Sequence, residues 1–137
     1  GAPFTFNADR FVNDLKSARK AGEGVFPGFE HGVGDPVEAK IKLSRTEKII
    51  LVEGLYVLLD DQPWCQLREE VFDETWFLDV PVSECNRRVL LRHLESGWAE
   101  EQAKQKVATN DSINAELVTK ASLKNADRLI QIFQASI

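Results

Sequence analysis

The sequence contains no methionine and only two cysteines, Cys65 and Cys85, among its 137 residues. Two cysteines are too few for a disulfide scaffold or a structural zinc site, so we expect a reducing compartment and hence a cytoplasmic location. The longest apolar run is far shorter than the roughly 20 residues that a membrane-spanning helix needs. The first residues lack the basic start and apolar stretch of a signal peptide, and with no initiating methionine present we expect the chain to begin inside a longer protein.

Basic residues are also fewer than acidic ones. The 22 acidic side chains outnumber the 17 basic ones and give a net charge of -5, which argues against an electrostatic nucleic-acid binder. Any site for phosphate must therefore be local. The length and the 43% hydrophobic content suit one domain with its own core. The sequence has no Gly-x-Ser-x-Gly motif and no serine, histidine and aspartate arrangement typical of a hydrolase.

One apolar run carries most of the information about a site. Residues 49–52 are apolar without interruption and are followed by Glu53 and Gly54. A continuous apolar run predicts a central parallel strand that helices cover on both faces. Ligands of such sheets bind beyond the carboxyl ends of the strands, so we expect Glu53 at the rim of a crevice, facing a magnesium ion or a bound phosphate. The alternative is a solvated turn acid after an ordinary core strand.

The rest of the pattern predicts helices and strands in alternation. We expect a helix from residue 7 or 8 to Gly22, a Gly/Pro-rich loop over 22–36, a short helix ending near 70, a strand over 75–80, a helix from 83 to Gly97, further helices over about 99–109 and 112–123, and a strand over 127–133. Strands separated by helices imply right-handed crossovers and a parallel sheet, which is an α/β fold.

Two arginines share a face of the helix predicted to start at residue 83. Arg88 and Arg92 are four residues apart, so both side chains can bind the same ligand. The polar segment over 99–109 that follows them has the character of a lid. The alternative is a solvated helix face on which the arginines pair with Glu84 or Glu95.

Several motifs, in their order and spacing, carry a resemblance to a known family. They are residues 1–6, residues 29–31 with 35–37, residues 52–56, residues 72–77, Arg88 with residues 92–94, and Asn110, Asp111 and Asn114. With these motifs the chain resembles the P-loop small-molecule kinases of the uridine kinase, phosphoribulokinase and pantothenate kinase group. The resemblance implies an α/β fold with a three-layer parallel sheet of P-loop kinase type. Residues 1–137 would form the C-terminal portion of one such domain, with a lid region over about 83–111.

The resemblance also predicts what this sequence lacks. Members of the group begin with a strand and a Gly-x-x-x-x-Gly-Lys-Ser/Thr loop that cradles phosphates. No such loop is present, and we expect it, with the family's turn that carries the catalytic base, upstream of Gly1. A family strand order like 2-3-1-4-5 would place the missing strand between residues 49–52 and 75–80. Each unpaired buried backbone group costs about 1–3 kcal/mol, so we expect an incomplete sheet and a chain that does not fold alone in the family's form.

The resemblance implies an ATP-dependent phosphotransferase that uses ATP and Mg²⁺ to phosphorylate a hydroxyl of a small metabolite such as a nucleoside, a sugar or a vitamin precursor. It assigns Glu53 to the metal and to catalysis, or alternatively to orienting the missing lysine or serine. Arg92 is assigned to catalysis and, with Arg88 and Lys106, to the nucleotide phosphates. Lys106 stands where relatives commonly carry arginine. No nucleic-acid or membrane partner is expected.

The resemblance assigns Asn7, Glu30 and His31 to contact with the molecule that accepts the phosphate. Asn7 replaces an aspartate of the family motif, which excludes proton transfer there and leaves a hydrogen bond to substrate or a helix N-cap. Glu30 replaces a shorter aspartate, and a loop histidine such as His31 is more often a surface residue. The alternative function is a non-catalytic kinase-like module for binding or regulation, and the fragment alone is expected to be inactive.

Overall fold

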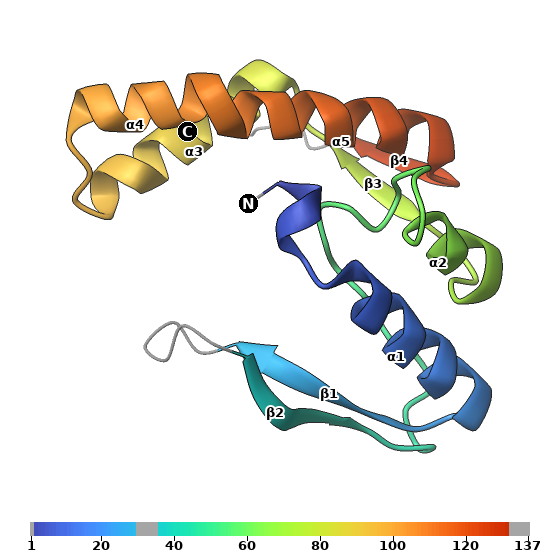
Figure 1. Cartoon of the computed structure of the whole chain (residues 1–137). Helices are drawn as coiled ribbons and strands as arrows, with labels where there is room; N and C mark the ends of the chain where they lie inside the picture. Colours follow the sequence, from blue (N-terminus) through green and yellow to red (C-terminus); the bar gives the residue numbers. More distant parts are fainter. Residues whose placement is uncertain (1, 30–35, 132–137) are drawn as a thin grey trace.

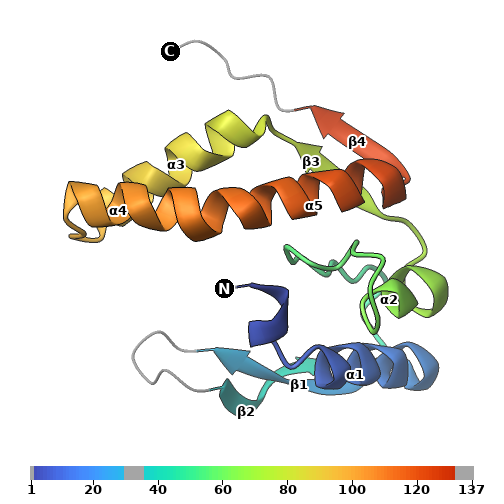
Figure 2. The same cartoon turned by 45° about the horizontal axis from the view of Figure 1, so that its top comes forward.

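The computed structural model describes residues 2–29 and 36–131, which form two groups of elements (Figures 1 and 2). The first group holds the helices α1 (Ala8–Ala21) and α2 (Cys65–Glu70) and the strands β1 (Gly24–Phe29) and β2 (Pro36–Leu43). The second holds the strands β3 (Trp76–Asp79) and β4 (Arg128–Gln131) and the helices α3 (Val82–Glu95), α4 (Glu100–Lys106) and α5 (Ser112–Asn125). The α/β class expected from the sequence is confirmed.

Helix α1 begins and ends where the sequence predicts. The Asn7 side chain accepts a hydrogen bond from the backbone N–H of Arg10 at 3.1 Å, which is an N-cap. Gly22 ends the helix in the left-handed region with φ of 72°, a conformation that glycine adopts without steric cost. Between these caps Val12 and Leu15 face the core.

The loop predicted over 22–36 is wrong for its first part, because residues 24–29 form strand β1. This strand pairs antiparallel with β2, from Gly24 opposite Leu43 to Phe29 opposite Pro36, and its register shifts between Phe26 and Gly28. The glycines suggested a loop, but Gly24 instead allows a close contact between β1 and α1. A Cβ at Gly24 would lie 2.8 Å from the Cβ of Ala18, so only glycine lets the strand approach α1 this closely.

The parallel pair β3 and β4 confirms the predicted strands over 75–80 and, within the described residues, 127–131. Trp76 lies opposite Arg128 and Asp79 opposite Gln131. The pair is locked at its start by buried Thr75, whose backbone N–H and hydroxyl each donate to the Asp127 carboxylate at 2.8 Å. Helix α5 packs on β3, and α3 packs on α5.

The central strand predicted over 49–52 is not formed in the structure. The run is irregular, and Ile49 and Leu51 are 81% and 92% exposed. No strand among the described residues pairs with it. An apolar run indicates a preference for burial, whereas a strand also needs a neighbour for its backbone hydrogen bonds. The prediction failed because that neighbour is not part of the described chain.

The main core joins the two groups of elements. Its buried residues are Val12, Leu15, Tyr56, Leu59, Trp64 and Leu67, and Val118 and Ala121 of α5 pack against them. The helices predicted over 99–109 and 112–123 are observed as α4 and α5, but a π-helical turn, η2 (Val107–Asp111), joins them into one long rod (Figure 1). None of the helices in the described ranges is long and apolar enough to cross a membrane.

Candidate kinase site

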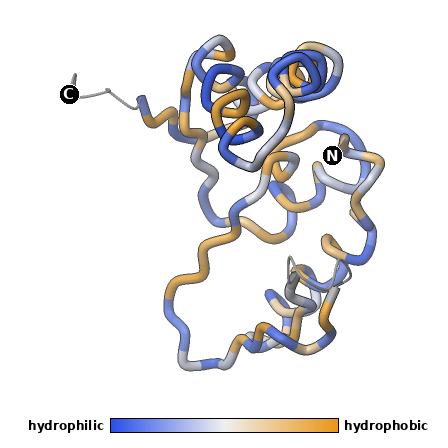
Figure 3. Tube along the Cα trace, turned by 90° about the vertical axis from the view of Figure 1, so that its left-hand side faces the viewer, coloured by the Kyte–Doolittle hydropathy of each residue, from blue (hydrophilic) through white to orange (hydrophobic). Residues whose placement is uncertain are grey.

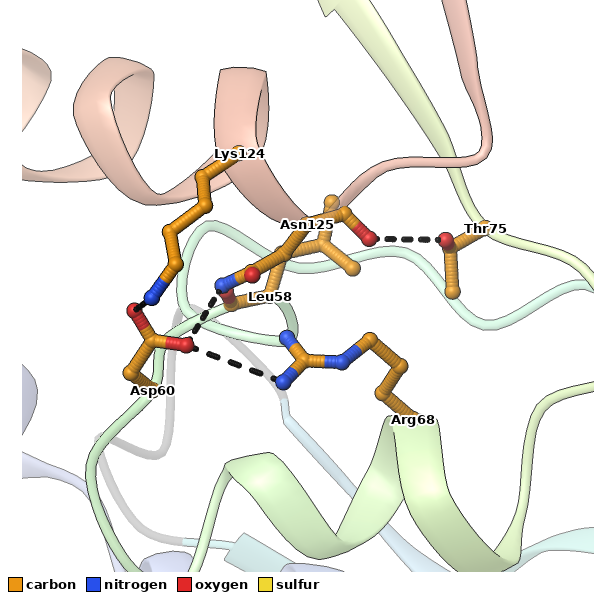
Figure 4. Close-up of polar contacts among 6 residues, drawn as sticks. All are labelled: Leu58, Asp60, Arg68, Thr75, Lys124 and Asn125. Carbon is orange, nitrogen blue, oxygen red and sulfur yellow. Dashed lines mark hydrogen bonds and ion pairs between the residues drawn. The ribbon is translucent and has the colours of Figure 1, made fainter.

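A polar cluster around Asp60 ties the two groups of elements together (Figure 4). The Asp60 carboxylate accepts hydrogen bonds of 2.9 Å from Lys124 and from Asn125 at the end of α5, and it forms an ion pair of 3.6 Å with Arg68 of α2. Asn125 also donates to the Leu58 carbonyl at 2.8 Å. The Lys124 ammonium, followed by the Asn125 amide, holds the pKa of Asp60 below its usual range. No sequence signal singled out this cluster, because the α5 partners of Asp60 lie more than sixty residues from it in the chain.

Helix α3 carries Arg88 and Arg92, the two arginines predicted to face a nucleotide. In the structure the two side chains differ in whether they pair with a carboxylate. Arg88 donates to the Glu84 carboxylate at 2.6 Å, and Arg87 donates to the same carboxylate at 2.7 and 2.8 Å. This is the local pairing that the sequence left open as the alternative for Arg88. Arg92 is exposed, and its side chain has no hydrogen bond or ion pair with another residue in the described ranges. Arg92 is therefore the guanidinium on this face that is available to a ligand.

The predicted phosphate-binding lysine lies at the end of the next helix. Lys106 is the last residue of α4, is half-buried, and lines a shallow surface hollow with Trp98, Gln102 and Thr109. Its ammonium forms no ion pair within the described part of the chain. Residues 83–111, which the resemblance predicts to be a lid, comprise α3, α4 and the π turn that follows, and their role as a lid stays a prediction.

Glu53 is exposed and lies outside any strand. It forms no ion pair with another described residue, and no group of three or more metal-ligating side chains is found around it or elsewhere in residues 2–29 and 36–131. The sequence predicts this carboxylate at the end of a paired strand. The structure does not show that position, because no strand in the described residues pairs with residues 49–52.

Asn7 lies at the mouth of a hollow of about 310 Å³ between the start of α1 and the segment before α2. Phe6 and Trp64 line the hollow with Asp9 and Asp61, so it offers aromatic faces beside carboxylates. The Asn7 side chain serves as the N-cap of α1, which is the plainer of its two predicted roles. Glu30 and His31, the other predicted acceptor contacts, lie outside the described residues.

A hydrogen bond that sequence reasoning missed links α3 to the π turn. His93 Nε2 of α3 lies 2.9 Å from a carboxylate oxygen of Asp111, and both side chains are about four-fifths shielded, at 19% and 20% exposed. Asn110 donates to the other Asp111 oxygen at 3.0 Å, and the Trp98 ring lies 5.1 Å from that of His93. Both segments are among the motifs that the sequence singled out, but no sequence signal pairs the histidine with a carboxylate eighteen positions away.

The parallel strand pair with helices packed against it defines the class of protein as an α/β fold. A solved structure from Silicibacter sp. TM1040, a fructose transport system kinase candidate by name, matches 94% of this chain with a TM-score of 0.82 at 25% identity. An ATP-dependent kinase-like protein, notR', from Aspergillus versicolor is 32% identical over 90% of this chain and 75% of its own length. A uridine kinase candidate from Schizosaccharomyces pombe is 36% identical over 88% of this chain and 52% of its own length.

The chain belongs to the family of ATP-dependent kinase-like proteins with the P-loop kinase fold. It spans about half the length of the Schizosaccharomyces pombe relative and 62% of the Silicibacter structure. No family model matches the chain. The resemblance stated from the sequence motifs is confirmed.

Proposed function

We propose that the protein is an ATP-dependent phosphotransferase that acts on a hydroxyl group of a small metabolite. The observation that carries the proposal is the 32% identity to an ATP-dependent kinase-like protein over 75% of that relative's length. The names of two other relatives, a uridine kinase candidate and a fructose transport system kinase candidate, support a nucleoside or a sugar as the acceptor. Both compounds present hydroxyl groups to the transferred phosphate.

Arg92 and Lys106 act on the nucleotide phosphates in this proposal. Phosphoryl transfer depends mainly on positioning and on positive charge around the transferring group. Arg92 is a planar, permanently charged donor without a competing carboxylate in the described chain, and Lys106 offers a second cation from the adjoining helix. Arg88 shares Glu84 with Arg87, so it contributes less than Arg92 unless phosphate displaces Glu84.

Glu53 is proposed as the protein ligand of magnesium. Mg²⁺ keeps several waters and is commonly bound by one or two carboxylates together with substrate phosphates, so a single exposed carboxylate fits this requirement. The metal, when bound, neutralises charge that develops on the phosphates. Asn7 donates or accepts a hydrogen bond at the acceptor, and Glu30 and His31 remain proposed contacts on the same side.

The direct test is a phosphorylation assay on the complete protein with ATP, Mg²⁺ and a panel of nucleosides and sugars. We expect ATP consumption that depends on one acceptor, and a loss of about 10- to 100-fold in kcat/KM for Arg92→Ala, because a charge-assisted hydrogen bond contributes about 1.5–3 kcal/mol. Arg45→Ala is the matched control, since Arg45 is an exposed arginine that pairs with Glu23 near the hairpin. A complete protein that binds a metabolite but never turns over ATP would instead support the non-catalytic binding module.

A further inference from the structure

One carboxylate on helix α3 holds two arginine side chains at once. Glu84 accepts hydrogen bonds from Arg87, three residues on, and from Arg88, four residues on. The Glu84 side chain is only 19% exposed, whereas those of Arg87 and Arg88 are 55% and 43% exposed. Helix α3 lies among the helices at the top of Figure 3, where hydrophilic and hydrophobic stretches alternate. Both arginine side chains therefore reach solvent, where an anion can compete with Glu84 for them.

The hydrogen bonds to Glu84 are not equivalent. Arg87 donates from Nε to one carboxylate oxygen at 2.7 Å and from Nη2 to the other at 2.8 Å, which is the paired fork of a guanidinium on a carboxylate. Arg88 donates from Nε, at 2.6 Å, to the oxygen that Nη2 of Arg87 already contacts. If Arg88 leaves, both oxygens of Glu84 keep a donor. Arg88 is therefore the partner that Glu84 can release at the lower cost.

Arg88 is also the partner that shares a helix face with Arg92. The two residues are four positions apart in α3, so their side chains are neighbours on its surface. Arg92 is exposed and forms no ion pair with another residue of the described ranges. A phosphate chain held by Arg92 can therefore reach Arg88, and its oxygens then compete with the Glu84 carboxylate for that guanidinium.

We propose that Glu84 is an internal competitor of the nucleotide phosphates for Arg88. The inference rests on the proposed kinase function, and it adds a residue that sets the affinity for the polyphosphate chain. In the free protein Glu84 holds Arg88. When the chain binds at Arg92, Arg88 moves to the phosphate oxygens and Glu84 stays paired with Arg87. Arg87 therefore favours phosphate binding without touching the ligand, because it keeps the released carboxylate occupied.

The charge of Glu84 suits this role. The hydrogen bonds from Arg87 and then from Arg88 lower the pKa of Glu84 to about 2, so the carboxylate is charged at neutral pH. Binding sites use repulsive as well as attractive elements to set their affinities. The opposite arrangement, in which Glu84 orients Arg88 toward the ligand, predicts weaker phosphate binding when the carboxylate is removed. The two arrangements therefore differ in the sign of one measurement.

The test measures the binding of inorganic tripolyphosphate and of ATP to the complete protein by titration calorimetry. We expect Glu84→Gln to tighten the binding of both by about threefold to tenfold, because it frees Arg88 and removes a repelling charge. Glu100→Gln is the matched control, since Glu100 pairs with Lys104 at 2.7 Å over the same four-residue spacing on α4. It should leave both affinities unchanged. Thermal melts should confirm that each variant is folded.

A second variant separates competition from direct contact. Arg87→Gln should weaken tripolyphosphate binding about threefold, because Glu84 then holds Arg88 alone. In the Glu84→Gln background the same change should have no effect. A direct contact of Arg87 with phosphate would instead weaken binding in both backgrounds. Because Arg87→Gln leaves Glu84 in place, it also tests the proposal if Glu84→Gln unfolds the protein.

The proposal is wrong if Glu84→Gln weakens binding or leaves it unchanged, or if Glu100→Gln tightens it equally. It is also wrong if Arg87→Gln has no effect or acts equally in both backgrounds. Arg92→Ala distinguishes this failure from a failure of the proposed function. If Arg92→Ala weakens tripolyphosphate binding while Glu84→Gln does not tighten it, only the competition by Glu84 is excluded. If the protein binds neither compound, or Arg92→Ala leaves the affinity unchanged, the assignment of α3 to the phosphates is wrong as well.

Discussion

Glu84 lies in the first turn of α3 and accepts hydrogen bonds from both Arg87 and Arg88. These bonds, those of Arg87 first, lower the pKa of Glu84 from 4.5 to about 2. Charge pairing at this one carboxylate therefore engages Arg87 and Arg88, whereas Arg92 forms no ion pair with a described residue.

The depressed pKa of Glu84 makes the start of α3 sensitive to acid. A carboxylate whose pKa is lower in the folded state stabilises that state above its unfolded pKa, and the contribution is lost as the pH falls from about 4.5 toward 2. We expect Glu84→Gln to remove this part of the pH dependence, measured by denaturant unfolding of the complete protein between pH 6 and pH 2.

The buried hydroxyl of Thr75 offers a second prediction for a single residue. Thr75 is 5% exposed, and its hydroxyl donates to Asp127 at 2.8 Å, which in turn lowers the pKa of that carboxyl. Thr75→Val keeps the shape but removes the hydrogen bond, so we expect a loss of about 1–2 kcal/mol in the free energy of unfolding.

Urea unfolding of the complete protein measures this loss. Thr109→Val is the matched control, because Thr109 is exposed and its hydroxyl donates to the Gln105 carbonyl one turn earlier in the chain. Equal stability of the two variants would contradict a locking role for Thr75.

At the scale of elements, a π turn joins α4 to α5 at the end of the predicted lid region. π turns inside helices are rare and are frequent at functional sites. Asp111 ends this turn and lies against His93 of α3, so the link fixes α3 relative to the rod formed by α4 and α5. Burial, and secondly the negative charge of Asp111, raise the pKa of Tyr56 in the core.

We expect Asp111→Ala to loosen the lid by removing the partner of His93. Amide exchange in α3 and α4 should speed up several-fold, while exchange in α1, which belongs to the other group of elements, should stay unchanged. In the complete protein, kcat should fall by a larger factor than the affinity for the acceptor, which is measured in the absence of ATP. Glu116→Ala on the exposed face of α5 is the control. Unchanged exchange in α3 would show that the helices are held by packing alone.

At the scale of the whole molecule, one core spans both groups of elements while one apolar run stays outside it. Leu67 is fully buried, whereas Leu51 is 92% exposed. A buried leucine truncated to alanine costs about 2–5 kcal/mol, and an exposed one changes stability by less than about 0.5 kcal/mol.

The same two leucines test this difference in burial. In thermal melts, Leu67→Ala should sharply lower the cooperative transition, and Leu51→Ala should leave the melt as it is. Equal melting temperatures of the two variants would contradict the difference in burial.

Local sequence determined most of the helices. The cap at Asn7, the glycine at 22 and the helical spacing of Leu15 and Ala18 define α1 with no help from distant residues. The strands at 76–79 and 128–131 were predictable too, because they are short apolar stretches between helices. The motifs that carried the family resemblance also needed only the sequence, since they depend on residue type and order.

Tertiary structure alone decided the rest. Whether residues 49–52 form a strand depends on a neighbour, because backbone hydrogen bonds of a sheet run between segments that the sequence does not pair. The hairpin over 24–43, the engagement of Arg88 by Glu84, and the contacts of Asp60 and His93 likewise depend on which residues meet in space. Local propensity acts over a few residues, whereas these contacts join groups up to 65 positions apart, so only the folded chain reveals them.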